Sequence, residues 1–119
     1  MKIDDQIEAL YDEVGERCPF KVAKHLGIAL YRYDLDDDIC GIYKMKGSTP
    51  IIILNSNIHI EMEETTCYLL VKHHKSHYGI DFGLNRSELQ VYERAESAQR
   101  KYLKKVTDTF LSFKINQWV

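Results

Sequence analysis

Three histidines lie within five positions in the stretch "KHHKSHYG", at His73, His74 and His77. On a helix, His73 and His77 stand one turn apart on the same face, which is the spacing with which two imidazoles bind zinc. In the metal-binding motif HExxH a glutamate follows the first histidine and serves as general base. His74 takes that place here. The alternative to a metal site is a polar, solvent-facing helix end, where partly charged imidazoles interact favourably with the negative end of the helix dipole.

The segment that carries these histidines has the pattern of one long helix. It runs from about residue 59 to 78, with Glu61, Glu63 and Glu64 in its opening turns and Gly79 after its end. Early acidic residues and a following glycine are typical of helix termini. Apolar residues near its middle are expected to pack in the core, namely Cys67, Leu69, Leu70 and Val71.

The sequence before this helix predicts two helices and three strands. Helical spacing covers residues 3–14, and "CPFKVAKHLG" has a proline and a glycine where a short helix begins and ends. The expected strands are residues 28–33, 39–45 and 51–55, separated by the acidic "DLDDD" and by the turn "KGSTP". This order favours an α+β fold in which a small three-stranded antiparallel sheet packs on helices.

The sequence after the histidines predicts a loop, a helix and a tail. The loop is "IDFGLN", and the helix runs from about Ser87 to Val106. The tail "TDTFLSFKINQWV" is expected to pack back through its apolar side chains, which are Phe110, Leu111, Phe113 and Trp118.

Length and composition narrow the class of protein. The 119 residues fit a single domain, residues 1–119, and a formal net charge of −2 argues against direct nucleic-acid binding. Three unpaired cysteines, no apolar leader and no long apolar run favour a cytoplasmic protein without a membrane segment. The acidic run Asp36–Asp38 is expected to be a solvated turn that could face a basic partner. The oligomeric state stays open.

Two stretches resemble a known family. "CPFKVAKHLGIAL" resembles the opening of ImmA/IrrE-type metallopeptidase domains, and "CGIYKMKGSTPIIILNSNI" is similar to the family's strand pair and Asn-containing turn before the catalytic helix. The resemblance covers about residues 18–106 and is closest to the short type that temperate phages and other mobile elements encode. It implies a zincin-like minimal fold and a partner that is a helix-turn-helix repressor of the lysogeny type.

The resemblance allows two registers for the catalytic helix. Alignment from "NSNI" without a gap places Leu69 at the first zinc ligand, Leu70 at the catalytic glutamate, and His73 and His74 at the closing pair. A leucine can neither deprotonate a zinc-bound water nor carry a proton. The rival register sets "HHKSH" on HExxH, with His73 and His77 as ligands, and requires a four-residue insertion after the Asn turn.

The family's third ligand is a carboxylate shortly before an Arg-Ala pair. "VYERAESAQRKYL" matches that stretch, and the ligand position falls on Tyr92. Glu93 is the next residue and points about 100° away on an ideal helix. The set implied for any bound metal is His73, His77 and Glu93.

Two hypotheses follow from the resemblance. The first is a pseudopeptidase without a cofactor, which regulates a helix-turn-helix repressor by binding it and carries degenerate active-site positions at Leu69, Leu70, His73 and Tyr92. The second is a zinc-dependent endopeptidase with an altered site at His73 and His77, which cleaves such a repressor.

Overall fold

The computed structural model describes residues 3–95 of the chain. The chain divides into two compact units, Met1–Arg86 and Ser87–Val119. The elements of the first unit are α1 (Ile3–Val14), α2 (Pro19–His25), β1 (Ala29–Tyr33), β2 (Ile39–Lys46), β3 (Thr49–Asn55), α3 (Ile60–Ser76) and β4 (Phe82–Asn85). The chain is again helical over residues 86–95. Within residues 3–95, no helix is long and apolar enough to cross a membrane.

The predicted helices are confirmed as far as the structure describes them. The first three expected helices coincide with α1, α2 and α3, within a few residues at each end. The remainder of the helix expected to reach Val106 lies outside the described residues, as do Phe110, Leu111, Phe113 and Trp118. The single domain over residues 1–119 stays a prediction.

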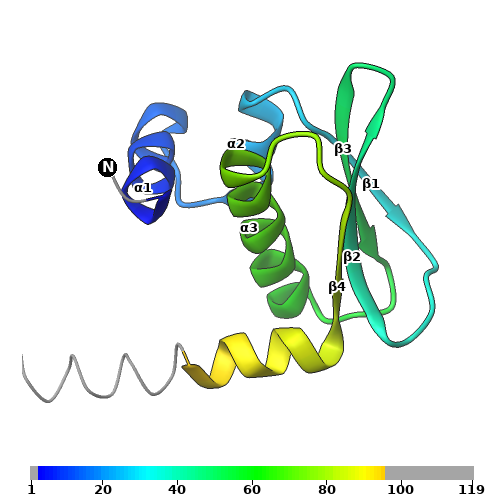
Figure 1. Cartoon of the computed structure of the whole chain (residues 1–119). Coiled ribbons are helices and arrows are strands. Elements are labelled where there is room, and N and C mark those ends of the chain that lie inside the picture. The colour runs from blue at the N-terminus through cyan, green and yellow to red at the C-terminus, as the bar shows by residue number, and fades with distance from the viewer. Residues whose placement is uncertain (1–2, 96–119) are drawn as a thin grey trace, which may run out of the picture. The chain divides into compact units, whose positions relative to one another are not determined.

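The sheet differs from the expected one in two respects. It has four strands in the order β1-β3-β2-β4, and β1 runs parallel to β3, so the prediction of a three-stranded antiparallel sheet is wrong (Figure 1). The fourth strand, β4, pairs antiparallel with β2 and comes from the segment that was expected to be a loop. The α+β class is correct.

Asn55, at the end of β3, bonds the connection that crosses from β1 to β2. Its side-chain nitrogen donates hydrogen bonds to the carbonyl oxygens of Ile39 at 2.7 Å and Asp36 at 3.1 Å. Its side-chain oxygen accepts one from the backbone nitrogen of Asn57 at 3.0 Å. These bonds hold the connection between β1 and β2 across the end of β3, because the amide satisfies its backbone carbonyls. β3 lies between β1 and β2, whereas a short hairpin would have paired β1 directly with β2.

Helices α1, α2 and α3 lie on one side of the sheet (Figure 1). The core lies between them and the sheet, and its buried members are Ile7, Tyr11, Val22, Ala23, Ile28, Tyr43, Ile52, Leu54, Cys67, Leu70 and Val71. Side chains alternate along each strand, so every second strand residue belongs to this layer.

Gly41 of β2 lets α3 approach the sheet closely. A Cβ atom at this position would lie 2.7 Å from Cγ2 of Thr66 and 3.1 Å from Cδ1 of Leu70. Real Cβ atoms do not approach other heavy atoms as closely as 2.7 Å. The absence of a side chain at Gly41 thus sets the depth at which the middle of α3 packs.

Candidate functional site

One face of α3 is buried against the sheet. Its buried residues follow one another at alternating intervals of three and one, and they are Glu63, Thr66, Cys67, Leu70, Val71 and His74. Leu70 has no exposed surface and lies against Gly41, and Val71 is equally enclosed, so the expected core packing of both is confirmed. Leu69 lies at the flank of this face and is only half-buried. The position that the resemblance assigns to the catalytic glutamate therefore holds a fully enclosed leucine.

His74 is buried, which contradicts the expectation of a wholly solvent-facing helix end. Only 8% of its surface is exposed, because the helix turns it toward the sheet. Its Nδ1 lies 2.8 Å from the hydroxyl oxygen of Tyr43, a residue with no exposed surface. The same hydroxyl oxygen accepts a hydrogen bond from the backbone nitrogen of Gly79 at 3.2 Å. Tyr43 thus links β2 to the end of α3 and to the segment that follows.

The surroundings of His74 favour its neutral form. Burial lowers the pKa of His74 below its usual value, and the neighbouring positive charges of Lys75 and His73 lower it further. In a neutral ring, Nδ1 can accept a hydrogen bond from the Tyr43 hydroxyl, whose oxygen also accepts one from the backbone nitrogen of Gly79. All three polar groups are then satisfied.

His73 holds the connection between α3 and β4. Its Nε2 donates a hydrogen bond to the carbonyl oxygen of Ile80, at 2.6 Å. Its ring stacks on Phe82 of β4, with centroids 4.6 Å apart, and on His77, with centroids 5.4 Å apart. The histidine clamp, defined as His73, His74 and Tyr43, therefore fixes residues 77–82 to the body of the unit.

His73 and His77 are the histidine ligands of the zinc alternative. Within residues 3–95, no three His, Cys, Asp or Glu residues gather closely enough to hold a metal ion. Nε2 of His73 is occupied by a backbone carbonyl, and Nδ1 of His77 lies 3.1 Å from the hydroxyl of Ser76. Two imidazoles are fewer than the three protein ligands of a catalytic zinc. Tyr92 and Glu93, the residues at and next to the third-ligand position, belong to the second unit.

Two further ionisable side chains of α3, those of Glu63 and Cys67, are buried. Glu63 is almost completely buried and pairs with Arg32 of β1. Burial raises the pKa of the Cys67 thiol to about 12, so this cysteine stays protonated at neutral pH and packs as a small apolar residue, as expected.

No protein-family model, curated protein or solved structure matches this chain. The resemblance of residues 18–106 to ImmA/IrrE-type domains therefore rests on the sequence motifs and stays a proposal.

Two partners of the histidines were not singled out from the sequence. A sequence pattern does indicate a strand at Phe82, because Phe82 and Leu84 alternate with Gly83 and Asn85 as in a half-buried strand. Tyr43 had no such pattern, since its contact with His74 joins residues 31 positions apart.

Proposed function

We propose that this chain is a non-catalytic, ImmA/IrrE-like pseudopeptidase that regulates another protein by binding it. The observation that carries the proposal is that Leu70, which the ungapped alignment assigns to the position of the general base, has no exposed surface. Hydrolysis by a zinc-bound water needs a carboxylate or a similar base within reach of that water. An enclosed leucine supplies neither a base nor space for a water.

The histidine clamp supports the same proposal. In the register that sets "HHKSH" on HExxH, His73 would bind the metal and His74 would take the place of the base, yet Nε2 of His73 binds the Ile80 carbonyl and Nδ1 of His74 binds Tyr43. These bonds give the histidines a role in holding β4. The contacts of His73 and His74 thus explain both histidines without a bound metal.

The partner follows from the resemblance. Intact members of the family act on helix-turn-helix repressors of the lysogeny type, so the proposed partner is such a repressor. Binding without hydrolysis would change the repressor's activity while leaving its chain intact. No cofactor enters this function.

Co-expression with such a repressor from the native host tests the proposal. The chain should co-purify with the repressor, and the mass of the repressor should equal that of the uncleaved protein. Metal content is measured on chain purified without added zinc and without a metal-affinity tag. The expected zinc content is far below one ion per chain.

The alternative is a zinc endopeptidase that uses His73, His77 and Glu93. Near-stoichiometric zinc together with repressor fragments would replace the proposal by this one. His73→Ala with His77→Ala should then abolish both zinc binding and fragmentation. His59→Ala, which changes an exposed histidine at the start of α3, is the matched control.

A further inference from the structure

The sheet face opposite the helices carries two exposed tyrosines on its edge strand. Tyr31 and Tyr33 of β1 are 41% and 55% exposed, and their rings stack with centroids 6.1 Å apart. Arg32, which lies between them, pairs with Glu63 of α3. Because side chains alternate along a strand, both tyrosines point away from the helices.

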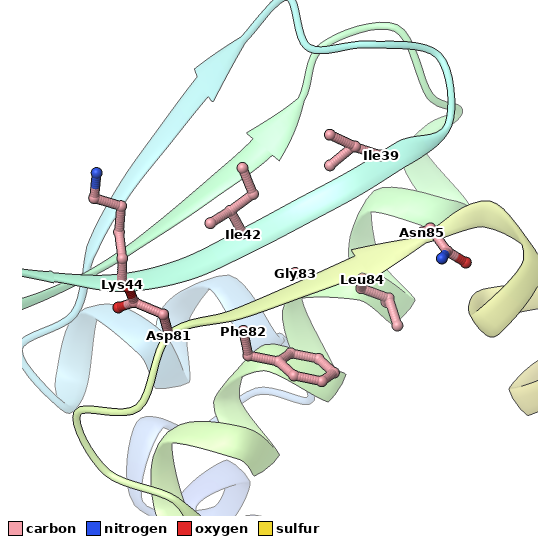
Figure 2. Close-up of a pocket in the computed structure, with 8 residues that line it drawn as sticks. All are labelled: Ile39, Ile42, Lys44, Asp81, Phe82, Gly83, Leu84 and Asn85. Atoms are coloured by element: carbon pink, nitrogen blue, oxygen red, sulfur yellow. The ribbon is translucent and has the colours of Figure 1, made fainter.

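The same face continues across all four strands. Tyr31 is in register with Ile53, Ile53 with Ile42, and Ile42 with Gly83, so these residues form one row. Figure 2 shows the side chain of Ile42 on one side of the sheet and the ring of Phe82 on the other. The row therefore lies outside the core.

An open groove of about 420 Å³ lies at the β4 end of this row. Its lining consists of Ile39, Ile42, Lys44 and residues 81–85 (Figure 2). Gly83 leaves the groove without a side chain, and a Cβ atom there would meet nothing within 4 Å. The open sheet face, defined as Tyr31, Tyr33, Ile42, Ile53 and this groove, thus has an aromatic part and an apolar hollow.

The acidic connection between β1 and β2 borders this face. Tyr33 ends β1 and Ile39 begins β2, so residues 34–38 lie at the end of the sheet where both residues stand. Asp36, Asp37 and Asp38 are exposed, and within residues 3–95 none of them forms an ion pair. Arg86 contacts this connection through the carbonyl oxygen of Asp37. The border keeps a net negative charge.

We propose that the open sheet face docks a basic, amphipathic segment of a partner protein. An apolar side chain of the partner enters the groove beside Gly83. Its arginines stack on the rings of Tyr31 and Tyr33 and pair with the carboxylates of Asp36–Asp38, since guanidinium groups bind both aromatic faces and carboxylates. Tyrosine and arginine are also enriched among the residues that dominate binding energy at interfaces. The inference rests on the proposed binding function and names its surface and the chemistry of its partner.

Charge argues against a second copy of this chain as the occupant. A symmetric dimer brings the same patch of two copies together. Each copy would then bring its own Asp36–Asp38 to the interface, and net negative charge on both sides opposes association. A basic partner removes this repulsion.

A synthetic amphipathic peptide, with arginines and leucines at helical spacing, is the probe. It is titrated into the full-length, ¹⁵N-labelled chain at low ionic strength, where charge pairing is strongest. The amide signals that shift should be those of β1, residues 34–39 and β4. A matched peptide with lysine in place of arginine should bind more weakly, because ammonium groups stack less well on tyrosine.

Paired variants locate the contact. Tyr31→Thr with Tyr33→Thr keeps the strand propensity of β1, and Asp36→Asn with Asp37→Asn removes two border charges. Each pair should raise the dissociation constant for the peptide roughly tenfold. The control is Asp12→Asn with Glu64→Gln, which removes two exposed charges from helix surfaces. It should change the constant less than about twofold.

Several results would overturn the proposal. These are an equal loss of binding in the control, shifts confined to the helices, or no shift at all. Concentration-dependent shifts of the same amides without peptide would identify a second copy as the occupant. Because the peptide assay needs no repressor, its failure is distinct from a failure of co-purification.

Discussion

The hydroxyl oxygen of Tyr43 lies 2.8 Å from Nδ1 of His74, and this bond joins the middle of the sheet to the last turn of α3. Neither residue has more than 8% of its surface exposed. The same hydroxyl holds the backbone of Gly79, which follows the end of α3 and has a φ of +80°, a conformation that glycine adopts readily. A histidine at the suspected metal site is thus part of the framework.

Removal of this hydroxyl tests the histidine clamp. Tyr43→Phe leaves Nδ1 of His74 and the Gly79 nitrogen without a partner, so the free energy of unfolding should fall by about 1–3 kcal/mol. Tyr68→Phe is the matched control, because its hydroxyl bonds Asp4 at the surface, and the change should stay below about 0.5 kcal/mol. Urea denaturation measures both. Equal stabilities of the two variants would refute the clamp.

The lowered pKa of His74 predicts that stability depends on pH. The unfolded chain binds a proton at His74 near the ordinary pKa of 6.5, whereas the folded chain binds it only at lower pH. The stability from neutral His74 is therefore present above pH 6.5 and is lost as pH falls below that value. Urea midpoints between about pH 7.5 and pH 5 should show a decline that is smaller in His74→Gln. His59→Gln should keep the full decline, and an identical decline in all three proteins would exclude this role.

The burial of Leu70 predicts a large effect of restoring a carboxylate there. Leu70→Glu places an unpaired carboxyl group in the core and should reduce the free energy of unfolding by more than about 3 kcal/mol. Ile60→Glu makes the same change on the same helix at a residue that is 60% exposed, so its effect should stay within about 0.5 kcal/mol. Thermal melting compares the two. An unchanged melting temperature for Leu70→Glu would mean that this position lies outside the core.

Gly41 and Gly83 predict opposite responses to an added methyl group. Gly41→Ala forces a Cβ atom against Thr66 and should destabilise the fold by about 1–3 kcal/mol. Gly83→Ala meets nothing within 4 Å, so its stability should change by less than about 0.5 kcal/mol. Denaturant midpoints of both variants decide the matter. A stable Gly41→Ala protein would show that α3 does not press on β2 at this point.

The helices were predictable from local signals, but the order of the strands was not. Pro19, Gly15 and Gly79 mark helix ends by their own conformational preferences. The connection from β1 to β2 crosses the end of β3, where the side chain of Asn55 bonds Asp36 and Ile39. No periodicity in the strands encodes that contact, and a short acidic loop suggested a hairpin instead.

The candidate site was also predictable only where local sequence determines the structure. The apolar type and helical position of Leu70 already implied core packing, and the structure confirms it. The burial of His74 could not be predicted, because it depends on the depth that Gly41 allows and on the placement of Tyr43. A histidine at a helix end has the same local sequence whether it faces water or a tyrosine.

The most direct test of binding without hydrolysis is a reporter controlled by the partner repressor, with the integrity of the repressor followed on a gel in the same cells. The starting chain and the double variant His73→Ala with His77→Ala are compared at equal chain levels and at a temperature where both are folded. We expect derepression by both proteins, with the repressor intact in both. Repressor cut by the starting chain and left whole by the double variant would contradict it and establish a peptidase.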